Sequence, residues 1–96
     1  MATLEAHCKE TENALGKPYR EVHLWLDEFF MTKEYGTRHR RKKHHERGIQ
    51  EAILLFGEEA GKAARMHIVT DLKEEGWTEK DRFPRDEREY VDMGLF

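Results

Sequence analysis

The stretch AGKAARMHIVTDL, residues 60–72, decides the fold. At about 100° per residue, five of its side chains fall within roughly a third of a helical circle. They are Ala60, Ala63, Ala64, His67 and Asp71. A stripe of alanines lets a neighbouring helix approach closely, so we expect His67 and Asp71 to point inward. Because an isolated buried charge is very costly, Asp71 is expected to be paired.

Helix breakers divide the rest of the chain into segments with helical periodicity and no strand alternation. The breakers are Gly16, Gly36, Gly57 and Gly76. We expect helices over residues 3–15, 18–35, 38–56 and 58–75. The predicted fold is therefore all-α, a compact bundle of about four helices with a turn-rich tail. The tail residues expected to cover the core are Trp77, Phe83, Tyr90, Leu95 and Phe96.

Composition limits the class of protein. A chain of 96 residues is expected to form one domain, 1–96, with a small core. No apolar run approaches the ~20 residues of a membrane span, and we expect no secretory signal. Cys8 is the single cysteine and is taken as an ordinary helix residue, which fits a reducing cytoplasm. The net charge of −3 gives no general attraction to nucleic acid or anionic membranes.

The functional signal is a repeated pattern of histidine and aspartate. Two His-x-x-x-Asp motifs, at residues 23–27 and 67–71, lie on either side of the doublet His44-His45. A spacing of four places both side chains on one helix face, where they can hold one ion or hydrogen-bond to each other. On its predicted helix His45 points inward and His44 lies on the flank. His39 lies on the opposite flank and is the weakest candidate.

Metal binding is the first interpretation of this pattern. Imidazole combined with carboxylate suits zinc, iron, manganese or nickel, although the spacing matches no HExxH signature. The candidate ligands are His23, Asp27, His44, His45, His67 and Asp71. In a metal-dependent hydrolase the ion would lower the pKa of a bound water, and a spare carboxylate, Asp27 or Asp71, would act as general base.

Two other interpretations remain open. Buried His–Asp pairs often serve only as hydrogen bonds between helices, which favours a non-catalytic interaction module, with homo-oligomerisation as one form of it. The basic run at residues 38–43 raises nucleic-acid binding. On one helix these charges spread around most of the circumference, so an ion-paired, solvated helix is favoured over a nucleic-acid surface.

Four motifs occur together in the chain. They are V-H-x-x-x-D at 22–27, R-H-R-x-x-x-H-H-x-x-G-I at 38–49, F-G at 56–57 and H-I-x-x-D-L at 67–72. In this combination the chain resembles a family of small uncharacterised bacterial proteins, over residues 17–90. The resemblance implies a shared polar set of His23, Asp27, His39, His44, His45, His67 and Asp71, and it implies no activity. The connection after F-G is shorter than in the family, and its closing tail motif is matched only loosely.

Overall fold

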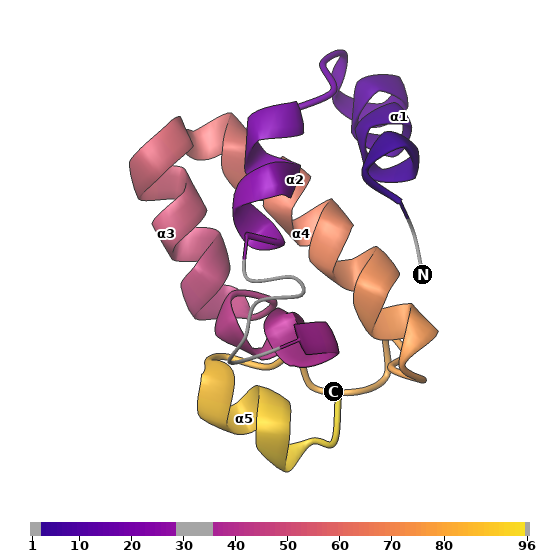
Figure 1. Ribbon diagram of the computed structural model, residues 1–96, viewed down its shortest axis with the longest axis vertical. Helices are drawn as coiled ribbons and strands as arrows, with labels where there is room; N and C mark the ends of the chain where they lie inside the picture. The colour runs from indigo at the N-terminus through magenta and orange to yellow at the C-terminus, as the bar shows by residue number, and fades with distance from the viewer. Residues whose placement is uncertain (1–2, 29–35, 96) are drawn as a thin grey trace.

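The packing of the chain centres on α4, Glu58–Glu74. The computed structural model describes residues 3–28 and 36–95, and in it α4 contacts three other helices (Figure 1). These are α1 (Leu4–Leu15), α2 (Arg20–Leu26) and α3 (Glu46–Phe56). The alanines of the α4 stripe are at most 1% exposed, which allows these close approaches. The predicted all-α bundle is confirmed, with no strand in the described ranges.

The first and fourth predicted helices match the structure to within one residue at each end. Thr3 caps α1, since its side chain accepts a hydrogen bond from the Ala6 N–H, and Gly16 ends the helix with φ of 86°. Only a residue without a Cβ adopts that conformation readily. The second helix is shorter than predicted, because it starts at Arg20 and ends at Leu26. Residues 29–35 of the predicted helix lie outside the described residues.

The prediction of one continuous third helix from residue 38 is wrong. A 3₁₀ helix, η1 (Gly36–Lys42), comes first, and α3 starts only at Glu46. The break arises at His45, which is the N-cap of α3. Its backbone is extended, and its ring Nδ1 accepts a hydrogen bond from the Gly48 N–H at 3.1 Å. The backbone N–H groups of Glu46 and Arg47, in the first turn of α3, have no acceptor within the helix. They donate to the Pro84 and Arg85 carbonyls of the tail, both at 2.9 Å.

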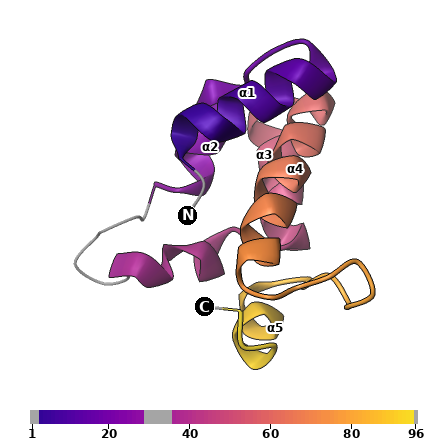
Figure 2. The ribbon, with the colours of Figure 1, turned by 90° about the vertical axis from the view of Figure 1, so that its right-hand side faces the viewer.

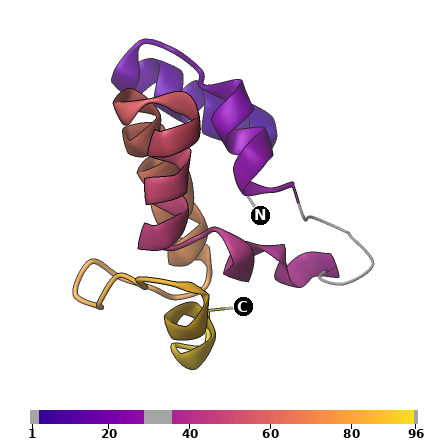
Figure 3. The same ribbon diagram turned by 90° about the vertical axis from the view of Figure 1, so that its left-hand side faces the viewer.

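The tail closes one end of the bundle. Figures 2 and 3 show the yellow helix α5 (Glu87–Asp92) below the lower ends of α3 and α4, with η1 beside those ends. Trp77, Tyr90 and Leu95 join the core as expected, and Phe83 packs against it. Phe96 lies outside the described residues. No helix among the described residues combines the length and the apolarity needed to cross a bilayer.

We predict that Gly48→Ala is far more destabilising than Gly61→Ala. A Cβ at Gly48 would collide with the backbone carbonyl of Lys43, and this backbone is fixed by the cap of α3. A Cβ at Gly61 would lie 2.6 Å from Cγ1 of Ile53, a side chain that can rotate. Urea denaturation should show a loss of about 3 kcal/mol or more for Gly48→Ala and about 1 kcal/mol for Gly61→Ala. Equal losses would contradict this account of the break.

Candidate functional site

All six histidines of the chain are buried, and none is more than 3% exposed. Histidine is usually only partly buried, so burial of every copy requires specific partners. Five of the histidines surround two aspartates. We call this group the His–Asp cluster; its members are His7, His23, Asp27, His39, His44, His67 and Asp71. They come from α1, α2, η1, α4 and the link between η1 and α3.

Asp71 lies at the centre of the cluster. Its Oδ2 is 2.9 Å from Nε2 of His44 and 3.2 Å from Nε2 of His67. Its Oδ1 is 3.3 Å from Nε2 of His7 and 3.4 Å from Nη2 of Arg40. Because Asp71 is only 2% exposed, these nitrogens replace the water that would otherwise solvate its charge.

Asp27 forms the solvent side of the cluster. Its Oδ2 is 3.4 Å from Nε2 of His67, and its Oδ1 is 3.6 Å from Nε2 of His44. The ring of His39, carried by η1, places Nε2 at 3.0 Å from the same Oδ1. The Asp27 side chain is 33% exposed, in contrast to 2% for Asp71. Water therefore reaches the cluster at Asp27.

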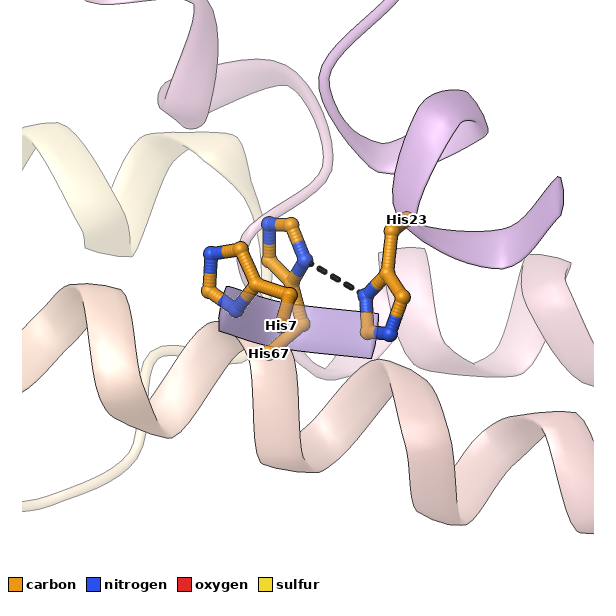
Figure 4. Close-up of side chains that lie close together, drawn as sticks. All are labelled: His7, His23 and His67. Carbon is orange, nitrogen blue, oxygen red and sulfur yellow. Dashed lines mark hydrogen bonds between the residues drawn. The ribbon is translucent and has the colours of Figure 1, made fainter. Parts of the chain in front are cut away.

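His67 also belongs to a stack of three imidazoles, with His7 and His23 (Figure 4). The rings of His7 and His67 lie face to face, with centroids 3.7 Å apart and planes 16° apart. His23 stands beside them, and its Nδ1 is 2.9 Å from Nδ1 of His67. His67 thus presents Nδ1 to His23 and Nε2 to the two carboxylates.

The environment of His23 fixes its tautomer. Its Nε2 lies 3.1 Å from Oγ1 of Thr11, and this hydroxyl donates its own proton to the Pro18 carbonyl at 2.6 Å. The Thr11 oxygen therefore accepts from a proton on Nε2 of His23, which leaves Nδ1 with a lone pair. The proton between the two Nδ1 atoms then belongs to His67, which donates it to His23.

Burial and charge divide the cluster into neutral and ionised groups. Burial lowers the pKa of His23 to about 4, and the neighbouring His67 and His7 add to the effect. Burial likewise lowers the pKa of His44 to about 4. Burial would lower the pKa of His67 too, but the carboxylates of Asp27 and Asp71, 3.4 and 3.2 Å from its Nε2, raise it instead. Burial opposes ionisation of both aspartates, yet their histidine partners hold each pKa well below its usual range.

The proton on His67 therefore occupies the place of a cation between two carboxylates. Two sets of possible ligand atoms share His67, and within each set the atoms lie within 4.8 Å of one another. One set comes from Asp27, His44, His67 and Asp71, and the other from His7, His23 and His67. A buried position lined by carboxylates and imidazoles is chemically suited to a metal ion.

The family of the chain follows from its sequence. A family model described as a domain of unknown function, DUF6915, matches residues 3–83. The chain belongs to this family. Its expected membership of an uncharacterised family is thereby confirmed, but DUF6915 carries no activity with it. No curated protein and no solved structure matches the chain.

Within this DUF6915 chain, the structure separates the histidine doublet. His23, Asp27, His44, His67 and Asp71 come together, whereas His45 does not join them. His45 is buried as expected, but its ring caps α3 and has its pKa lowered chiefly by burial. The predicted orientation assumed one helix through both residues. The break before Glu46 turns His44 toward α4 instead.

Two residues of the site escaped the sequence interpretation. His7 sits on the buried face of α1 with Cys8 and Thr11, and the i, i+4 pair of His7 and Thr11 was the available signal. Arg40 is 6% exposed, although the basic run around it was expected to be solvated. Nothing in the run distinguishes Arg40, because its partners are contributed by α4 and the turn that follows.

We predict that the metal-free protein loses stability as the pH falls from about 6.5 to 4. In the unfolded chain His23 and His44 take up protons near 6.5, but in the folded chain only near 4. The unfolded state therefore binds more protons in this window, at about 3 kcal/mol per histidine by pH 4. The raised pKa of His67 adds stability mainly as the pH falls toward 6.5, and its contribution is nearly constant below that pH, so it does not offset the loss.

Urea denaturation at several pH values, in the presence of a chelator, measures this effect. His44→Gln removes one of the two titrating groups, so its stability should vary less across the same window. A stability that stays level between pH 6.5 and 4 would contradict the neutral assignment of His23 and His44.

Proposed function

We propose that the His–Asp cluster binds a divalent metal ion through His44, His67 and Asp71, with Asp27 beside the ion. The supporting observation is the convergence of one ligand atom from each residue within 4.8 Å, with three of the four side chains buried. Bond lengths of about 2.0–2.2 Å keep neighbouring ligand atoms roughly 3–3.5 Å apart. The His44–Asp71 and His67–Asp71 distances, 2.9 and 3.2 Å, are close to this range.

The surrounding side chains position these ligands. Metal-binding carboxylates are usually hydrogen-bonded from outside the coordination shell. His39 supplies this contact to Asp27, and Arg40 supplies it to Asp71. Arg40 is itself held by Glu75, with Nη1 at 3.1 Å from Oε1. The mixed imidazole and carboxylate set suits zinc, iron, manganese or nickel.

Hydrolysis is the activity that we favour for this centre. A metal ion here would supply a water of lowered pKa. Of the two candidate bases, Asp27 is the better one, because it is partly exposed and Asp71 is enclosed by Arg40 and histidines. His44, His67 and Asp71 then act as ligands and leave a fourth position for water, as in catalytic zinc sites.

A non-catalytic interaction module is the second candidate, and a separate observation supports it. Leu54 and Leu55 at the end of α3 are 86% and 61% exposed, and Leu24 on α2 is 53% exposed. Exposed leucines of this kind are typical of surfaces that meet another chain. In this alternative the His–Asp cluster only ties the helices together, and a second copy of the chain covers the leucines.

Nucleic acid remains a disfavoured partner. Arg40 is ion-paired with Asp71 and Glu75, and Arg41 with Glu87 at 2.8 Å. Basic side chains engaged in this way present little free positive charge to a phosphate backbone. We keep the cytoplasm as the expected location, because Cys8 is buried as a free thiol.

We predict that the untagged protein gains thermal stability from at least one of Zn²⁺, Mn²⁺, Fe²⁺ or Ni²⁺. A ligand that binds only the folded state adds about 2.7 kcal/mol at a hundred times its Kd. His44→Gln should abolish most of the gain. His45→Gln is the matched control, an adjacent buried histidine outside the cluster, and should keep it. Identical melting curves with and without all four metals in the unmutated protein would overturn the proposed centre.

A second variant tests whether Asp27 acts as a general base or as a metal ligand. If Asp27 is the general base, Asp27→Asn keeps its metal but loses about 10²-fold or more in turnover of a chromogenic phosphoester. Elemental analysis and activity are measured on the same sample. Loss of metal from Asp27→Asn would make Asp27 a fourth ligand and the site a closed one. Absence of hydrolysis in a metal-loaded unmutated protein would favour the interaction module.

A further inference from the structure

His7 is not a ligand of the proposed centre, and among the described residues its ring nitrogens lack the hydrogen bonds that a buried imidazole normally makes. The side chain is 2% exposed, yet within the described chain neither ring nitrogen has a partner in hydrogen-bond geometry. Its nearest carboxylate oxygen, Oδ1 of Asp71, lies 3.3 Å from Nε2 but out of line for a hydrogen bond. Leaving a buried polar group unsatisfied costs about 1–3 kcal/mol. Apolar packing on α1 would have avoided this cost.

The neighbours of His7 are two further buried imidazoles. His7, His23 and His67 come from α1, α2 and α4, and each offers one nitrogen within 4.8 Å of the others. All three rings are stacked, with interplanar angles between 16° and 23° (Figure 4), so His7 has to turn its ring to aim a nitrogen at an ion in the plane of His67. The group lies where three helices meet, and Asp71 borders it through Oδ1 beside His7.

His23 is held in the manner of a metal ligand. A ligating histidine usually donates its other ring N–H to a backbone carbonyl or a carboxylate, which fixes the ring. In His23 the Nε2 side faces Oγ1 of Thr11, which is itself fixed by its hydrogen bond to the Pro18 carbonyl. Its Nδ1 lone pair then points at His67, and the 2.9 Å between the two Nδ1 atoms matches the spacing of neighbouring ligands.

We propose a second metal position, formed by His7, His23 and Nδ1 of His67. It rests on the proposed function only in sharing His67, whose Nε2 serves the first position. The cluster is then a two-metal centre in which the His67 ring lies between the ions. Ligated at both nitrogens, His67 is an imidazolate, with its two ring protons released to solvent, and its negative charge offsets part of the second cation's charge.

The two positions differ in chemistry. Three imidazoles without a carboxylate ligand suit zinc or copper, whereas the first position, with two carboxylates, also suits iron and manganese. Asp71 is the nearest anionic group to the second position, through Oδ1 near His7. The second ion therefore gives His7 a cation to bind and lies near Oδ1 of Asp71, which already faces Nη2 of Arg40 at 3.4 Å.

Counting bound Zn²⁺ tests the proposal. Chelator-stripped, untagged protein is titrated with Zn²⁺ and examined by native mass spectrometry. We expect two ions per chain at saturation in the unmutated protein and in His45→Gln, and one ion in His7→Gln. A single ion in the unmutated protein at saturation would overturn the second position and leave the first intact. No bound ion would overturn both.

A measurement on the unmutated protein covers the case in which His7→Gln does not fold. The ¹⁵N chemical shifts of the histidine rings are followed during the same titration. We expect the His7 and His23 ring nitrogens to shift with one equivalent of Zn²⁺, and His44 with the other. If saturation leaves the His7 and His23 nitrogens unmoved, these rings bind no metal and only pack the helices together.

Discussion

The burial of one carboxylate organises this molecule. Asp71 is carried into the interior by the alanine face of α4, where its charge has to be compensated by other groups. The compensating nitrogens come from His7 on α1, Arg40 on η1, His44 in the following link, and His67 on α4 itself. Each of these elements is therefore positioned by its contact with Asp71 as well as by apolar packing. The polar cluster and the apolar core therefore hold the same helices in place.

Because the cluster is part of the interior, the fold is stabilised by buried polar contacts as well as by apolar burial. The apolar core contains many alanines, whose burial contributes little area compared with leucine or phenylalanine. Among the described residues, ten polar or charged ones are buried beside it. Hydrogen bonds in such a network contribute strongly only when every member is satisfied. His7, with neither ring nitrogen hydrogen-bonded to a described residue, is one place at which the metal-free network is incomplete.

Sequence periodicity predicted the parts of this structure that depend on one helix at a time. The spacing of His67 and Asp71, the alanine stripe and the glycine breakers all act locally, and the structure has them as expected. The choice between His44 and His45 depends on the break before α3. That break needs carbonyls from residues 84 and 85, which no local pattern reveals. His7 and Arg40 were missed for the same reason, since their roles are set by distant helices.

The hydrogen bonds from Glu46 and Arg47 to the Pro84 and Arg85 carbonyls also have a consequence for biosynthesis. A growing chain emerges from its N-terminus, so the first three helices and η1 leave the ribosome before residues 84 and 85 do. Until then the start of α3 lacks its acceptors, and the link that carries His44 lacks this support. The centre is completed only after residues 84 and 85 have emerged. A nascent chain therefore carries its histidines for some time without the geometry to use them.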